Sequence, residues 1–462
     1  MVYLLISIIV LFISTLLFKK AAGSLSITKP NMVSYIYYWQ LLTMTFVGSI
    51  LVILMQDDHY VINRVSDEAR LKGWLAVMYV MVVVPIGMLA AKRIWLGRKK
   101  VSLFLDDYAQ KKIDTFGMSG SSLKYSVWFF TALSILSCLY TFYTIRYFPF
   151  IKAFTSSSST LDVLRISSAR NFSGIVYVKN ILSVKLMPLL SYVWAFYYIA
   201  NKRLSDGIMF FITFLMAASI LYYDFSKSPL LWYILSYIFV YYYAGVRFRF
   251  SRLLLLGGVV FLILVVMYSA RGIGLFDFVS HNSGPIGRII LGQIAGTYYM
   301  FDIFPSVHDF IGFSSLTQSL SNLFGYDYVE RAARIAMIDF NPRGIEEGTA
   351  GVMNSLFVAE AWANFGLIGV LISPLWVGFL IGNLYYFFLK RRKNPLWLAL
   401  FVTFSYGGSF TGGFNDYIYN GGNFTLVTLV IAILLTASLF GNYRKSRALN
   451  EHHLSSPSPT RS

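Results

Sequence analysis

Apolar runs of bilayer length recur along almost the whole of this 462-residue chain, and they constrain its fold more than any other feature. A helix needs about 20 apolar residues to cross the hydrocarbon core of a membrane. Hydrophobic residues make up 57% of the sequence and charged residues only 13%, whereas a soluble domain has about 25% charged residues. The sequence therefore predicts an all-α, polytopic integral membrane protein.

Eleven runs are long enough to form transmembrane helices of one bundle. They lie at 2–18, 34–56, 73–91, 126–143, 186–200, 207–223, 229–245, 253–269, 366–389, 395–413 and 423–441. Lys19 and Lys20 follow the first run and no cation precedes it, which is the opposite polarity to a cleaved signal peptide. We expect a retained first span with the N-terminus outside and the C-terminus in the cytoplasm.

The distribution of Lys and Arg agrees with this topology. Short cytoplasmic loops collect cations, and in this orientation the basic segments 92–125, 201–206, 246–252 and 390–394 all fall on the cytoplasmic side. Topology and anionic lipid headgroups thus account for the net charge of +18, and no nucleic-acid partner is expected. The single cysteine, Cys138, excludes an intrachain disulfide and a Cys-rich metal site.

The longest interruption of the apolar pattern runs from about 270 to 365. We expect it to be a large extracytoplasmic loop of a membrane domain formed by residues 1–447, followed by a disordered cytoplasmic tail at 448–462. Two stretches inside the loop, 289–301 and 350–365, are mostly apolar and are expected to form re-entrant or interfacial helices. In the alternative, both cross the membrane, which gives thirteen spans and places Glu360 inside the bilayer at a cost of several kcal/mol.

Ionisable side chains are absent from the interiors of all eleven predicted spans, whereas ion-coupled carriers usually need them near the bilayer midplane. We therefore expect a site at the outer membrane face, open to an amphiphilic substrate. Arginine and lysine there suit a diphosphate, because they donate charge-assisted hydrogen bonds to its oxygens. The candidates are Arg165, Arg170, Arg271 and Lys227. The alternatives are lipid snorkelling or salt bridging, and Lys227 could instead pair with Asp224 across its turn.

Polar residues elsewhere in the outer segments add further candidates. A glycine-rich loop at 341–351 contains Arg343 and Glu347, which could place a general base beside a cation that binds the diphosphate leaving group. The alternative is a plain surface loop. The stretch 414–420 mixes aromatic rings with amides, a combination that suits sugars but also interfacial aromatic belts. Its candidate sugar-binding residues are Asn415, Asp416, Tyr417 and Asn420.

Three other charged groups are weaker candidates. Glu330 and Arg334 have the i,i+4 spacing of an exposed helix pair, and Arg331 lies between them, so all three are expected on a solvated helix. His281 and His308 lack further ligands at metal-binding spacing, so no metal site is expected. A proton-transfer role for either histidine is left open.

Three stretches of the chain resemble the bacterial O-antigen polymerases of the Wzy type, which polymerise oligosaccharide repeat units. They are the turn 224–228, the segment 165–174 and above all the segment 348–369. The resemblance implies an inner-membrane enzyme that transfers the growing glycan from undecaprenyl diphosphate to an incoming carrier-linked repeat unit at the outer face. It is also compatible with a GT-C-like arrangement of the helices. The related O-antigen ligases usually have a histidine just before the asparagine that corresponds to Asn354, where this chain has Met353.

The residues and the resemblance together suggest a mechanism without a metal or other cofactor. Arginines would bind the diphosphate and stabilise its developing charge, and Glu360 or Glu347 would accept the proton of the attacking sugar hydroxyl. The arginines proposed for this role are Arg165, Arg170, Arg271 and Arg288. Expected partners are undecaprenyl diphosphate-linked oligosaccharides, membrane lipids and a chain-length regulator protein. The alternative functions are a ligase and, from another class, a flippase or exporter of lipid-linked oligosaccharide.

Overall fold

The computed structural model describes residues 1–115, 120–156, 158–269, 274–282 and 284–454, and within these ranges the chain is helical with no β-strand. Within the described ranges, eight helices are long and apolar enough to cross a membrane. These two findings confirm the predicted class, a multi-pass helical membrane protein.

The eight candidate spans coincide with eight of the eleven predicted runs. The other three runs are helical as well, but the helices are shorter or carry a shorter apolar segment: α11 (Lys227–Tyr243), α12 (Phe250–Ser269) and α20 (Pro395–Gly407). A count of eleven spans therefore remains a prediction, as does the orientation of the chain in the membrane.

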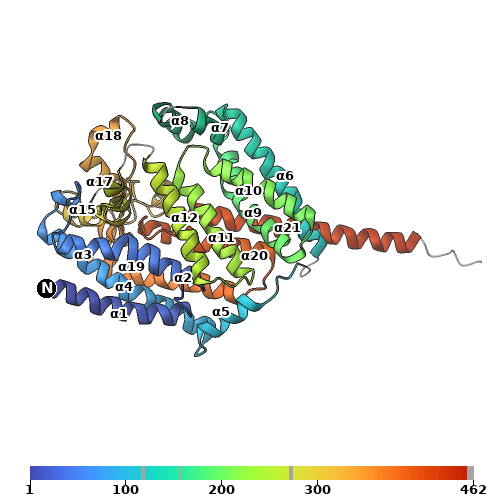
Figure 1. The fold of residues 1–462 in the computed structure, drawn as a ribbon, viewed down its shortest axis with the longest axis horizontal. Helices are drawn as coiled ribbons and strands as arrows, with labels where there is room; N and C mark the ends of the chain where they lie inside the picture. The colour runs from blue at the N-terminus through green and yellow to red at the C-terminus, as the bar shows by residue number, and fades with distance from the viewer. Residues whose placement is uncertain (116–119, 157, 270–273, 283, 455–462) are drawn as a thin grey trace, which may run out of the picture. The chain divides into compact units, whose positions relative to one another are not determined.

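The chain divides into two compact units, the first of which comprises residues 1–107, 247–390 and 405–420. Its long helices are α1 (Val2–Ala22), α4 (Asp67–Leu96) and α19 (Phe357–Lys390). Helices α4 and α19 pack side by side (Figure 1). Gly87 of α4 and Gly378 of α19 allow the close approach, because a Cβ at either position would collide with a backbone carbonyl of the other helix.

Between α1 and α4, the helical segment from residue 32 to 53 is built from α2 (Met32–Tyr35), the π-helix η1 (Ile36–Phe46) and α3 (Val47–Ile53). The short 3₁₀ helix η2 (Ile62–Arg64) precedes α4, and α5 (Val101–Gln110) follows it.

The predicted large loop of the first unit contains several short helices. They are α13 (Leu275–Val279), α14 (Gly284–Ile290), α15 (Ala295–Ile303), α16 (Gln318–Leu323), α17 (Ala332–Phe340) and α18 (Pro342–Glu346). The apolar stretch 289–301 is divided between α14 and α15, and each is too short to span a bilayer. In the other apolar stretch, residues 350–356 are not helical and residues 357–365 form the beginning of α19, which breaks at Gly366.

The second unit comprises residues 108–246, 391–404 and 421–462. Its helices are α6 (Gly120–Ile145), α7 (Pro149–Thr155), α8 (Ser158–Arg170), the π-helix η3 (Val178–Lys185), α9 (Leu186–Asn201), α10 (Leu204–Leu221), α11, most of α20 and α21 (Gly421–Leu454). Helix α9 is buried along nearly its whole length, so it forms the core of this unit. A disordered tail was expected from residue 448, but α21 continues to Leu454; residues 455–462 lie outside the described part.

Candidate functional site

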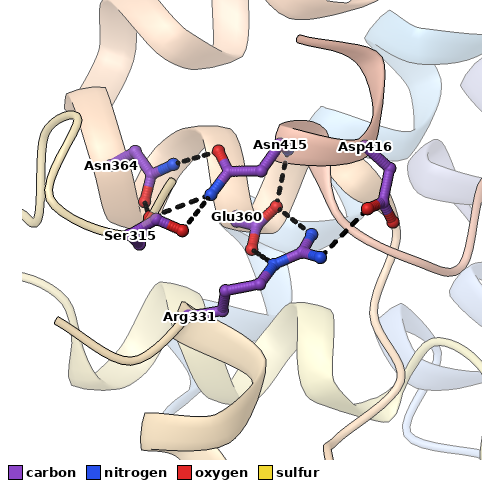
Figure 2. Close-up of polar contacts among 6 residues, drawn as sticks. All are labelled: Ser315, Arg331, Glu360, Asn364, Asn415 and Asp416. Atoms are coloured by element: carbon purple, nitrogen blue, oxygen red, sulfur yellow. Dashed lines mark hydrogen bonds and ion pairs between the residues drawn. The ribbon is translucent and has the colours of Figure 1, made fainter. Parts of the chain in front are cut away.

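An arginine bound by two carboxylates lies in the first unit, where α17, α19 and the 3₁₀ helix η4 (Phe414–Tyr417) meet (Figure 2). Nε and Nη2 of Arg331 donate to Oε1 and Oε2 of Glu360 at 2.8 and 2.9 Å. Nη1 of the same guanidinium donates to Oδ1 of Asp416 at 3.0 Å. The bidentate pair with Glu360 fixes the plane of the guanidinium as well as its position.

Local structure explains how these three side chains are presented. Arg331 is the N-cap of α17 and has extended backbone angles, so its side chain leaves the helix at its first turn. Glu360 lies in the first turn of α19, where a carboxylate interacts favourably with the helix dipole. Asp416 is held by the tight turn of η4.

Two glycines shape the elements around the ion pairs. Gly366 has φ 60° and ψ −142°, a conformation that side-chain-bearing residues rarely adopt, and it ends the helical segment that carries Glu360. Gly413 precedes η4, and a Cβ at this position would collide with Nη2 of Arg331 and with the carboxylate of Glu360. The close packing of loop 408–413 against the ion pair therefore requires glycine at 413.

Buried amide and hydroxyl groups form the other half of this network. The side chain of Asn415 donates to the carbonyl and hydroxyl oxygens of Ser315 at 2.8 and 3.0 Å and accepts from Asn364 at 3.0 Å. Ser315 in turn donates to Asn364 at 3.1 Å, which closes a ring of three residues. The backbone N–H of Asn415 donates to Oε2 of Glu360 at 2.8 Å and connects the two halves.

The network is closed around Glu360 and open around Arg331 and Asp416. The Glu360 side chain is 1% exposed, whereas those of Arg331 and Asp416 are 35% and 41% exposed. Burial acts to lower the pKa of the Arg331 guanidinium, but the hydrogen bonds and negative charges of Glu360 and Asp416 raise that pKa overall. Arg331 thus remains charged, and its partly exposed side chain and that of Asp416 can meet a ligand.

The geometry also limits what the network can bind. With all groups ionised, one cation faces two carboxylates, so the net charge is negative and a diphosphate would be repelled. Hydroxyl groups suit it better, because they can accept from the guanidinium and donate to Asp416.

The structure brings three predicted site residues into this network: Glu360, Asn415 and Asp416. Glu360 was expected to accept a proton, but both of its oxygens already accept hydrogen bonds and the side chain is buried. The side chain of Asn415 likewise forms hydrogen bonds to other residues of the protein, Asn364 and Ser315. Of the three, only Asp416 combines a place in the network with substantial exposure.

Three predicted site residues that are not cations remain to be described: Tyr417, Asn420 and Glu347. The ring of Tyr417 packs against Phe357 and Phe410, and its hydroxyl donates to Ser409 at 3.1 Å. Asn420 lies at the end of the same segment, just before α21. Glu347 is exposed in the turn after α18 and takes no part in the network.

The predicted diphosphate-binding cations are divided between the two units. Arg288 on α14 and Arg343 on α18 are exposed and belong to the first unit. Arg165 on α8 is exposed and Lys227 begins α11, both in the second unit. Arg170 ends α8, but its side chain lies outside the described part, as does all of Arg271. The Asp224 carboxylate accepts from the backbone N–H and hydroxyl of Ser226.

Sequence reasoning undervalued Arg331 and missed Ser315 and Asn364. The expected solvated helix pair of Glu330 and Arg334 was wrong, because α17 begins only at Ala332 and Arg334 instead donates to the carbonyl of Gly351 at 2.8 Å. The described residues contain no group of three or more His, Cys, Asp or Glu side chains arranged to hold a metal ion. No family model, curated protein or solved structure matches this chain.

Proposed function

We propose that this protein is a membrane glycosyltransferase of the O-antigen polymerase type. It would transfer a growing glycan from undecaprenyl diphosphate to an incoming carrier-linked repeat unit at the outer face of the inner membrane. The proposal rests on the sequence resemblance described above and on one structural observation, the half-exposed Arg331 and Asp416 pair held by buried Glu360. A helical membrane protein with such a pair among its short loop helices is suited to a substrate with a lipid carrier and sugar hydroxyls.

The geometry changes the roles proposed for two residues. Glu360 is a positioning residue, because its oxygens are committed to Arg331 and to the backbone of Asn415. Arg331 and Asp416 are the sugar-binding pair, in which the guanidinium donates to a hydroxyl oxygen and the carboxylate accepts from a hydroxyl.

Diphosphate binding belongs outside the network, since the network carries excess negative charge. Arg288 and Arg343 are predicted cations of the same unit that the structure describes, and their exposure fits contact with a ligand. Arg165, Arg170, Arg271 and Lys227 remain proposed phosphate contacts from the sequence.

Deletion of the gene, followed by gel analysis of surface glycans, tests the proposed function. A polymerase predicts loss of the polymer ladder with single repeat units still displayed on the cell surface, and restoration of the ladder by the wild-type gene. Loss of all attached glycan would contradict it. Lipid-linked units then accumulating in the cytoplasmic leaflet would indicate a flippase, and lipid-linked polymer accumulating at the outer face would indicate a ligase.

A further inference from the structure

A second polar cluster lies in the first unit and contains a histidine that the proposed function has not used. Oδ2 of Asp339 accepts from the hydroxyl of Tyr299 at 2.7 Å, and Oδ1 of Asp339 lies 3.9 Å from Nε2 of His308. That nitrogen is buried and has no hydrogen-bond partner among the described residues. The His308 and Asp339 side chains are 36% and 33% exposed, so the cluster is accessible although Nε2 itself is not.

These side chains come from α15, from the segment that follows α15, and from α17. Tyr299 belongs to α15, His308 follows the end of that helix with its backbone N–H bonded to Ile303, and Asp339 lies in the last turn of α17. The His308 ring packs against Phe304 with a centroid distance of 5.7 Å. Two short helices and one aromatic contact thus place the imidazole beside the carboxylate.

Helix α17 connects this cluster to the arginine network. Arg331 precedes its first residue, and Asp339 is its penultimate residue, eight positions further along. At 1.5 Å per residue the two positions are about 12 Å apart along the helix axis. One extended ligand of a few sugar rings can therefore reach both clusters.

The arrangement is suited to proton transfer. A carboxylate facing one imidazole nitrogen favours the tautomer with the proton on that nitrogen, which leaves the other nitrogen as a base. Tyr299 fixes the opposite oxygen of Asp339 and so orients the carboxylate. The gap of 3.9 Å is longer than a hydrogen bond, but such pairs often tighten only when the substrate binds. Arg64 and Asp302 are the other charged groups that act electrostatically on Tyr299.

We infer that His308 is the general base of glycosyl transfer, with Asp339 and Tyr299 as its positioning residues. The inference rests on the proposed function and supplies the proton acceptor that buried Glu360 cannot provide. The acceptor hydroxyl oxygen forms a bond to the anomeric carbon of the growing glycan while the bond from that carbon to the diphosphate oxygen breaks. The diphosphate leaves with the electron pair, and the hydroxyl proton moves to Nδ1 of His308.

The test uses purified full-length protein in liposomes and lipid-linked repeat units extracted from a strain that lacks the gene. His308→Gln should lower the rate of chain extension by about 100-fold or more, the usual contribution of general base catalysis. His308→Ala should regain part of the lost rate when imidazole is added, a rescue that a purely structural role would not produce. His281→Gln is the matched control, since His281 is exposed and bonds only the carbonyl of Gln56 among the contacts described here.

The positioning residues give a second test that does not depend on the fold of the His308 variants. Asp339→Asn and Tyr299→Phe should lower kcat for chain extension and leave KM for the repeat unit near its wild-type value, because both residues orient the base. A wild-type rate in His308→Gln would overturn the inference while leaving the polymerase proposal intact. A wild-type protein that forms no polymer from these units would overturn both.

Discussion

Glu360→Gln should destabilise the protein more than any other single change to an acidic group of the arginine network. The substitution keeps the size of the side chain but removes its charge and replaces one acceptor oxygen by an NH₂ group. That group would face a donor on Arg331 or Asn415, because both Glu360 oxygens accept hydrogen bonds there. Arg331 would keep one hydrogen bond to the remaining amide oxygen, and the more exposed Asp416 would be its only carboxylate partner in the network.

The expected cost follows from burial. Breaking a buried ion pair costs about 3–5 kcal/mol, and because Arg331 is 35% exposed and keeps one carboxylate, we expect about 2–3 kcal/mol for Glu360→Gln. Asp416→Asn removes one bond to a 41% exposed carboxylate and should cost about 0–1 kcal/mol. Glu330→Gln, an exposed site next to Arg331, should stay within about 0.5 kcal/mol of wild type.

The measurement is the free energy of unfolding of the four proteins in the same detergent, with tryptophan fluorescence as the readout. A Glu360→Gln protein as stable as Glu330→Gln would refute the reasoning, because it would mean that the buried pair does not hold the network together.

Three further predictions concern other positions. Gly413→Ala should abolish polymer formation without changing any charge, because its Cβ displaces Arg331. Gly408→Ala is the control: a Cβ there meets nothing within 4 Å, so the surface glycan ladder of that strain should be normal. Gly366→Ala should lower the free energy of unfolding by about 1–3 kcal/mol owing to its positive φ; an unchanged value would contradict the strained conformation. Lys393→Met should lower the free energy of unfolding by about 1–3 kcal/mol in the same assay, because the buried ammonium donates to the carbonyls of Tyr108, Ala109 and Lys111. An unchanged free energy would show that water replaces the ammonium as the donor to these carbonyls.

The helical framework could be predicted from the sequence because each span can be recognised from its own run of apolar residues. A run such as 73–91 is apolar along its whole length, and the structure has α4 there. The sequence separates the apolar stretch 350–365 from the span that begins at 366, and the structure breaks α19 at the same residue, Gly366. This boundary could be predicted because a glycine stands where the polarity of the sequence changes. Such features need no knowledge of distant residues.

The candidate site could be predicted only in part, because its pairs are distant in sequence. Arg331 meets Glu360 and Asp416 across 29 and 85 residues, and no local pattern links them. The spacing of Glu330 and Arg334 was misleading because it assumed a helix that starts two residues earlier than α17 does. Glu360, Asn415 and Asp416 were identified by residue type. Whether each side chain is hydrogen-bonded inside the protein or exposed to a ligand depends on tertiary packing.

The most direct test of the central claim is polymerisation by the purified protein. Wild-type protein and the Gly413→Ala and Gly408→Ala variants would be reconstituted in liposomes with undecaprenyl diphosphate-linked repeat units from the deletion strain, and the products separated by gel. The account predicts a ladder of lipid-linked polymer from the wild type and from Gly408→Ala, and unextended units from Gly413→Ala. Unextended units in the wild-type reaction, or an equal ladder from Gly413→Ala, would contradict it.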